Sequence, residues 1–170
     1  GEHFPVVAVV AHVVRPGLRL EPPRHQDVES RLVWLYRVTG DKEIANHWST
    51  PVLFKGAMYG MFQFKQYGAG PVKAVDVATG AVKWQENAAL KKGAIHYADG
   101  KLYLLEEGTG TVALIDASPD GWKEHGRFTL TPQTTQRNPK GKVWTHPTVA
   151  NGKLYLRDQD LIYCYNVKGS

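Results

Sequence analysis

Cysteine is almost absent from this chain of 170 residues, which contains only Cys164. One thiol cannot form an intrachain disulfide, so the sequence does not indicate an oxidising compartment. Cys164 lies in the alternating run 161–165, Leu-Ile-Tyr-Cys-Tyr. A thiol in such a strand is expected to be a buried structural residue rather than a nucleophile.

Long hydrophobic runs are also missing. A membrane helix needs roughly 18 apolar residues, and the most apolar stretch, 6–14, is far shorter. Its β-branched residues favour a buried strand. No basic segment precedes it, so an attached signal peptide is not expected.

Charge is spread rather than concentrated. The formal net charge is +5 and the isoelectric point is near 9.3, but no basic run is longer than Lys91-Lys92. A nucleic-acid-binding surface needs clustered cations. The distribution therefore predicts an ordinary solvated surface and argues against a nucleic-acid partner.

Recognisable catalytic and metal-binding motifs are lacking too. The seven histidines show no zinc-site spacing, and no Gly-x-Ser-x-Gly elbow surrounds Ser49. The acidic residues fall mostly in predicted turns, which does not favour a Ca²⁺ site. Structural roles are therefore expected for the histidines, although His47 and His146 stand at equivalent strand starts and could meet.

Aromatic residues and turn formers are plentiful. Aromatic residues make up 11% of the chain, which has 17 glycines and 10 prolines, as expected for many short strands. In the stretch 74–84, Ala-Val-Asp-Val-Ala-Thr-Gly-Ala-Val-Lys-Trp, two strands flank a tight turn. Asp76 is expected to accept hydrogen bonds from the turn, and Gly80 to adopt positive φ.

An internal repeat of about 40 to 50 residues organises the centre of the chain. The segments 49–60, 93–104 and 145–156 each read as a strand, an x-Gly turn and a strand with a tyrosine. Asp99-Gly100 and Asn151-Gly152 are strong hairpin signals. A third strand follows each hairpin and a fourth follows the first two, so the repeat predicts four-stranded antiparallel blades.

These units define the expected organisation. Residues 1–30 read as an atypical N-terminal strand with a Pro-rich linker, and 31–170 as the repeat region. Within that region, 31–47 contains an orphan outer strand with Trp34, 48–90 and 91–142 are blades, and 143–170 is a blade without its fourth strand.

The pattern Ala-x-Asp-x-x-Thr-Gly-x-x-x-Trp resembles the tryptophan-docking motif of β-propellers related to the pyrroloquinoline quinone (PQQ) proteins and to the BamB-like lipoproteins. Its carriers are Ala74, Asp76, Thr79, Gly80 and Trp84. The resemblance implies an all-β propeller fold with about half a ring in this chain. It implies a structural role for the motif, with Trp84 joining neighbouring blades, and favours an extracytoplasmic location.

A half-propeller would expose apolar blade faces, which predicts a homodimer or another homo-oligomer, or else a fragment of a longer protein. The third blade lacks the outer strand that 31–38 could supply. Two copies joined head to tail would then close a ring of about six blades.

The mouth of the propeller channel is the expected place for a ligand. Tryptophan, histidine and asparagine there would suit a sugar, a peptide or another polar molecule, although both tryptophans could instead pack between blades. The candidate residues are Asn46, His47, Trp48, Lys92, Trp144 and His146.

The leading functional hypothesis is a non-catalytic propeller scaffold that binds a protein or peptide partner, without a cofactor. The family dehydrogenases hold PQQ with Ca²⁺ and often carry two adjacent cysteines, a pair that this chain cannot supply. A fragment or accessory domain of a PQQ-dependent dehydrogenase is the alternative. Sugar binding at the channel is a second alternative.

Overall fold

The computed structural model describes residues 49–62, 70–138 and 141–168, which form eleven β-strands and no helix. No helix in this part of the chain could therefore span a membrane. Some sequence predictions lie outside the described residues. These are the N-terminal segment 1–30, the outer strand at 31–38, and the candidate ligand residues Asn46, His47 and Trp48.

The strands form three antiparallel sheets in chain order. Sheet 1 has the order β1-β2-β3-β4, sheet 2 has β5-β6-β7-β8, and sheet 3 has β9-β10-β11. The strand bounds are β1 (Val52–Phe54), β2 (Ala57–Met61), β3 (Pro71–Asp76), β4 (Val82–Lys91), β5 (Gly93–Ala98), β6 (Lys101–Glu106), β7 (Thr111–Asp116), β8 (Glu124–Thr129), β9 (Thr148–Ala150), β10 (Lys153–Asp158) and β11 (Leu161–Asn166).

Each sheet begins with the predicted two-residue hairpin. In the first turn Lys55 and Gly56 have φ of +47° and +73°. Asp99-Gly100 and Asn151-Gly152 repeat this geometry, which is that of a type I′ turn and matches the twist of the flanking strands. The fourth strand of sheet 1 continues well past Trp84, and a register shift lets Lys91 pair with Pro71.

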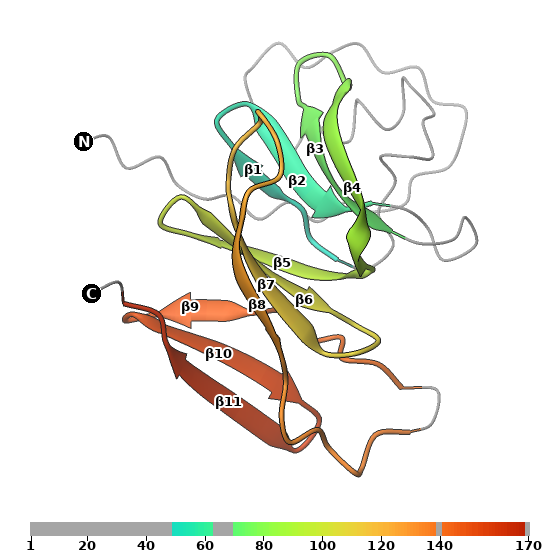
Figure 1. Ribbon diagram of the computed structural model, residues 1–170, viewed down its shortest axis with the longest axis vertical. Coiled ribbons are helices and arrows are strands. Elements are labelled where there is room, and N and C mark those ends of the chain that lie inside the picture. Colours follow the sequence, from blue (N-terminus) through green and yellow to red (C-terminus); the bar gives the residue numbers. More distant parts are fainter. Residues whose placement is uncertain (1–48, 63–69, 139–140, 169–170) are drawn as a thin grey trace, which may run out of the picture.

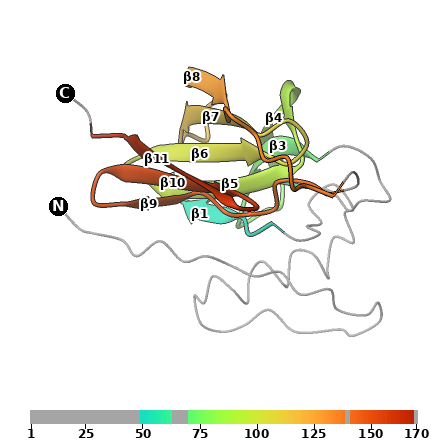
Figure 2. The same cartoon turned by 90° about the horizontal axis from the view of Figure 1, so that it is seen from below.

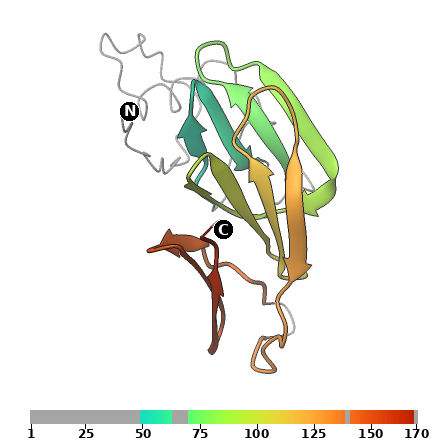
Figure 3. The ribbon, with the colours of Figure 1, turned by 60° about the vertical axis from the view of Figure 1, so that its left-hand side comes forward.

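The sheets follow one another as consecutive blades. The inter-sheet contacts with the most residue pairs involve the inner strands, with β5 against β1 and β2 on one side and against β9 on the other. Figure 1 shows the three sheets fanned out in chain order, and Figure 3 shows sheet 3 set apart from the other two. The chain is therefore all-β and has the architecture of a partial β-propeller, with two four-stranded blades and one three-stranded blade.

Two apolar cores lie between the sheets. The first packs Tyr59, Val72 and Ala74 of sheet 1 against residues such as Leu102 and Leu104 of sheet 2. The second packs Tyr103, Leu105 and Val112 of sheet 2 against Leu154 and Leu156 of sheet 3. Alternation along each strand sends one set of side chains to each neighbour, so sheet 2 contributes to both cores.

The two outward faces of this stack differ. Side chains of sheet 1 that alternate away from sheet 2 are still buried, with Met58 4% and Val75 0% exposed. On sheet 3 the corresponding strands alternate between buried and exposed residues, and Figure 2, seen from below, has this sheet on the near side. Only sheet 3 therefore presents an open blade face in the described structure.

Tyr59 carries the one buried side-chain polar atom that lacks a hydrogen-bond partner among the described residues, its hydroxyl. Burial, with a smaller effect from Asp120, raises the pKa of Tyr59 to about 12. We expect Tyr59→Phe to raise the free energy of unfolding by about 1 kcal/mol, because a desolvated and unpaired hydroxyl is removed.

The matched control for this prediction is Tyr163→Phe. The Tyr163 hydroxyl donates to the carbonyl oxygen of Pro132, so this variant should lose about 1 kcal/mol. Urea titrations of both variants measure the difference. Equal losses in the two would show that the Tyr59 hydroxyl is paired in solution.

Candidate functional site

The turn between β3 and β4 fixes Trp84 against the neighbouring sheet. Asp76 Oδ1 accepts the backbone N–H groups of Ala78 and Thr79, both at 3.0 Å, and the Thr79 hydroxyl at 3.1 Å. Gly80 follows with φ of +76°, as expected from the sequence. The Thr79 N–H first, then Lys83 Nζ at 3.2 Å and the other hydrogen bonds of the turn, hold the pKa of Asp76 below its usual value.

Trp84 lies between sheets 1 and 2. Its indole Nε1 donates to the Ser118 carbonyl oxygen at 2.9 Å. Its ring centroid lies 6.2 Å from that of Tyr59 and 6.1 Å from that of Trp122, which meets it edge to face. One side chain of β4 therefore contacts both the core of its own sheet and the β7–β8 connection of the next.

A second turn of the same kind, which was not predicted from the sequence, lies between β6 and β7. Glu106, Thr109 and Gly110 repeat the spacing of Asp76, Thr79 and Gly80. Glu106 Oε2 accepts the Thr109 N–H at 2.6 Å and its hydroxyl at 2.7 Å, and Gly110 has φ of +72°. A search for acidic-x-x-Thr-Gly with either acid would have found it.

Asp116, which corresponds to Asp76, is held by two lysines and a histidine instead of a Thr-Gly turn. Its carboxylate contacts Lys101 Nζ at 2.5 Å, His125 Nε2 at 2.6 Å and Lys123 Nζ at 3.3 Å. These partners, Lys101 first, hold the pKa of Asp116 well below its usual value. Through Lys123 and His125, the Asp116 carboxylate joins the two ends of the extended β7–β8 connection.

Equivalent positions in the three sheets can be assigned from strand register. Tyr59 pairs with Ala74, Tyr103 with Leu114, and Tyr155 with Cys164. Val72, Val112 and Ile162 stand at one further equivalent position, each two residues earlier on the third strand. The sequence repeat is thus also a repeat of pairing geometry.

Exposure at these equivalent positions rises sharply in sheet 3. The tyrosines are 0%, 8% and 38% exposed, and Val72, Val112 and Ile162 are 0%, 2% and 73% exposed. The first two members of each set are covered by the next sheet, and the third has no next sheet in the described structure. The outer face of sheet 3 is therefore built like a covered blade face but is open.

Cys164 lies on this open face and is exposed. The expectation of a buried thiol was wrong. The alternating pattern did place Cys164 at the position of the fully buried Ala74. The sequence could not show that sheet 3 lacks a neighbour on that side.

Aromatic residues of β8 and β11 pack together where sheets 2 and 3 meet. Phe128 of β8 lies 4.8 Å from Tyr165 of β11, measured between ring centroids, and Tyr165 is stacked nearly parallel to Tyr163.

In the second blade, Gly126 takes the place that Trp84 has in the first, because Gly126 pairs with Leu114 as Trp84 pairs with Ala74. No atom lies within 4 Å of where its Cβ would be, so the second blade has open space at the position of the docking tryptophan.

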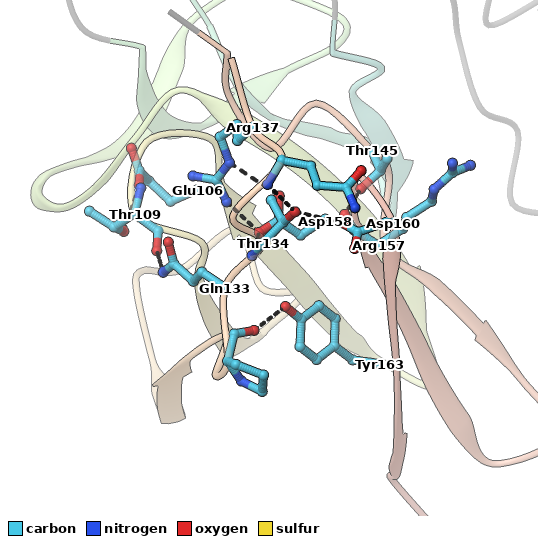
Figure 4. A network of polar contacts seen from close by, with 12 residues as sticks. Glu106, Thr109, Gln133, Thr134, Arg137, Thr145, Arg157, Asp158, Asp160 and Tyr163 are labelled. Atoms are coloured by element: carbon cyan, nitrogen blue, oxygen red, sulfur yellow. Dashed lines mark hydrogen bonds and ion pairs between the residues drawn. The ribbon is translucent and has the colours of Figure 1, made fainter. Parts of the chain in front are cut away.

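A polar network fastens the loop 131–138 to sheet 3 (Figure 4). Asp158, whose side chain is fully buried, accepts hydrogen bonds from Arg137 Nε at 3.2 Å and from the Thr134 N–H at 3.2 Å, and forms an ion pair with Arg137 Nη2. Thr134 also donates to Asp160. These contacts connect the end of sheet 2 with the β10–β11 turn.

Among the predicted channel-mouth residues, the structure links Lys92 and Trp144 through Glu107. The Glu107 N–H donates to the Lys92 carbonyl at 3.0 Å, and its own carbonyl accepts the Val143 N–H at 2.9 Å. Trp144 Nε1 donates to Glu107 Oε2 at 3.0 Å. Glu107 was not predicted, because its role depends on three loops that are distant in sequence.

His146 lies near a histidine that the sequence did not single out. His96, on the inner strand β5, accepts the Val149 N–H through Nε2 at 3.2 Å. Burial, assisted by the charge of His146, lowers the pKa of His96. Burial also lowers the pKa of His146, although this residue is the more exposed of the two. His47, which could meet His146 according to the sequence, lies outside the described residues.

This histidine pair predicts a pH dependence of stability. A pKa of His96 below the unfolded value of 6.5 means that the unfolded chain binds more protons near that pH. Stability should therefore be complete above pH 6.5 and fall as the pH decreases below it. Denaturant midpoints between about pH 7.5 and 5.5, a window above the carboxylate range, measure the effect.

His96→Asn is the control for this pH dependence. It removes the titrating group and should flatten the profile, with His146 supplying the remaining slope. An unchanged slope in His96→Asn would assign the dependence to other histidines.

No group of three or more His, Cys, Asp or Glu side chains in the described ranges is arranged to hold a metal ion. A cavity of about 490 Å³ lies between the end of β4 and the outer part of sheet 2. It is lined by Leu90, Lys91, Glu106, Thr109, Thr111, Arg127, Phe128 and Thr129. None of these was among the predicted ligand residues.

No protein-family model matches this chain, and a comparison with curated proteins finds no match. Among solved structures, a europium-containing methanol dehydrogenase is similar, with 18% sequence identity and a TM-score of 0.49. The alignment covers 69% of this chain and 22% of that protein, so this chain spans about a fifth of its length.

Proposed function

We propose that this chain is a non-catalytic propeller scaffold that binds a second copy of itself through the open side of sheet 3. The observation that carries the proposal is the exposure of Ile162 and Tyr155 at positions that are buried in the other two sheets. The equivalent residues of sheet 1 are covered by sheet 2, and those of sheet 2 are covered by sheet 3. A further β-sheet packed on this face is therefore the best-matched partner.

The energetic reason lies in the exposed apolar side chains. Complete burial of a side chain such as Ile162 stabilises an interface by about 1.5–3 kcal/mol. Tyr155 adds aromatic surface on this face. Of the five large exposed hydrophobic residues in the described structure, Tyr155 and Ile162 therefore both lie on the open face of sheet 3.

The edge of sheet 3 supports the same proposal. β7 is covered on its outer side by β8, whereas β11 has no described strand on its corresponding side. Such an edge presents unpaired N–H and C=O groups that favour the addition of a further strand. The expected outer strand at 31–38, outside the described residues, remains a candidate for this position.

The arrangement of the two copies follows from the contrast between the outward faces. A head-to-tail ring would require the far face of sheet 1, where Met58 and Val75 are already buried. A two-fold dimer uses the same patch on both copies, and only the patch on sheet 3 is open. We therefore propose an interface between the two copies of sheet 3.

The non-catalytic part of the proposal is supported by how the carboxylates are used. Asp76 and Glu106 hold turns, Asp116 holds lysines and a histidine, and Asp158 holds Arg137. These acids are engaged in structural contacts. A rise in melting temperature on adding PQQ with Ca²⁺ would contradict this part, because a ligand that binds the native state stabilises it.

Light scattering after size exclusion tests the dimer. Wild type should have the mass of two chains, and Ile162→Lys should be monomeric. Val82→Lys is the matched control, because Val82 is also exposed but lies on β4. Lys153 and Arg157 share the open face, so two copies bring like charges together and higher salt should strengthen the dimer.

Alkylation of Cys164 gives an independent readout. The thiol lies on the proposed interface, and it is the only one in the chain. Its alkylation should slow as protein concentration rises in wild type but not in Ile162→Lys. A wild-type monomer at all concentrations, with equally reactive Cys164, would overturn the proposal.

A further inference from the structure

We infer that Trp144 and Glu107 form a binding site for a neutral sugar ring. Trp144 lies on the connection between sheets 2 and 3 and Glu107 on the β6–β7 turn, and the site uses none of the residues proposed for the dimer. It goes beyond the scaffold role, and its test does not depend on the oligomeric state. The inference begins with the exposure of Trp144, which is 56%.

Trp144 is exposed but held in place. Its indole Nε1 donates to Glu107 Oε2, and the preceding residue, Val143, is 1% exposed within the second core. The other two described tryptophans, Trp84 and Trp122, are half-buried and contact each other. Trp144 therefore differs from them in presenting a fixed aromatic surface to solvent.

Glu107 is fixed as well. Its backbone N–H and C=O are both hydrogen-bonded, to the carbonyl of Lys92 and to the N–H of Val143. The carboxylate is held at the edge of the Trp144 ring by the indole hydrogen bond. Two recognition groups are thus pre-organised side by side, which reduces the entropy lost when a ligand binds.

The chemistry of this pair fits a sugar ring. An aromatic face packs against the apolar C–H face of a pyranose, while a carboxylate at its edge accepts hydrogen bonds from the ring hydroxyls. An ionised carboxylate has about four acceptor positions, and the indole uses one. The remaining acceptors are available to a polyhydroxylated ligand.

A cation is the other ligand class that an aromatic face with a carboxylate could bind. The Glu107 carboxylate lies at the edge of the indole ring, where Nε1 donates to it, whereas a cation–π contact uses the face of the ring. A pyranose contacts the face and reaches the edge with its hydroxyl groups, so a sugar uses the two groups together.

Isothermal titration calorimetry and the indole ¹H–¹⁵N signal of Trp144 test the inference. The probes are methyl β-D-glucopyranoside and cellotetraose, with tetramethylammonium chloride as the cation and glycerol as a polyol without a ring. We expect saturable binding of the sugars with dissociation constants on the order of millimolar, as for a shallow site with few contacts. Glycerol and tetramethylammonium should not saturate.

Variants distinguish this site from binding elsewhere. Trp144→Ala should abolish sugar binding without shifting the denaturation midpoint, because the ring is exposed. Glu107→Gln keeps an acceptor for the indole but loses the charge, and should weaken sugar binding about tenfold. The inference is overturned by the absence of saturable sugar binding, by sugar binding that survives in Trp144→Ala, or by tighter binding of tetramethylammonium.

Discussion

Trp84→Ala should lower the free energy of unfolding by about 3–5 kcal/mol. Trp84 packs beside Tyr59 and Trp122 and donates to the Ser118 carbonyl. Its removal leaves a gap between sheets 1 and 2 and an unpaired carbonyl. Since small domains are stable by about 5–15 kcal/mol, a large share of the total stability would be lost.

Two variants separate packing from hydrogen bonding in this prediction. Trp84→Phe keeps an aromatic ring but loses the indole N–H, and should cost about 1–2 kcal/mol. Trp144→Ala removes a tryptophan of the same size from an exposed position and should change the midpoint little. Urea or thermal unfolding measures all three. A fully stable Trp84→Ala would show that this tryptophan does not join the blades.

Arg137→Ala should cost about 3–5 kcal/mol, because it leaves the carboxylate of Asp158 buried without its cation. The two side chains are 15% and 0% exposed. The remaining partner of Asp158 is the Thr134 N–H at 3.2 Å. The loop 131–138 would lose its ion pair with sheet 3 and keep the hydrogen bonds of Thr134 and Pro132.

The double variant Arg137→Met with Asp158→Leu provides the diagnostic control. Replacing both members of a buried ion pair by apolar residues is often neutral, so this variant should stay within about 1–2 kcal/mol of wild type. Lys123→Ala is the exposed comparison, since Lys123 Nζ is paired with Asp116 while its side chain is 72% exposed. An Arg137→Ala variant with a wild-type midpoint would mean that Asp158 is solvated.

The repeat in the sequence predicted the sheets because local physics sets their form. Asp99-Gly100 and Asn151-Gly152 can adopt positive φ, which selects the tight hairpin. Alternation in 101–106 and 111–116 then assigns side chains to two faces. The Asp76-to-Gly80 turn could be predicted equally well, since the hydrogen bonds that close it join residues at most five positions apart.

The contacts of the candidate site could be predicted less well from the sequence, because they join residues that are distant in the chain. Lys92 and Trp144 were named, but Glu107, which links them, was not. His146 lies near His96, which the sequence did not single out, and its possible contact with His47 stays a prediction. Such contacts depend on how separate loops pack.

By itself, the sequence determined the strands, their hairpins and their grouping into repeated four-stranded units, because these follow from side-chain alternation and from the φ preferences of turn residues. Tertiary structure alone decided which faces are covered. Tyr59 and Tyr155 occupy the same place in the repeat, yet one is fully buried and the other is exposed. The physical reason is that a side chain on a sheet face becomes buried only when another part of the chain packs on that face. Sheet 3 has a described neighbour on one side only.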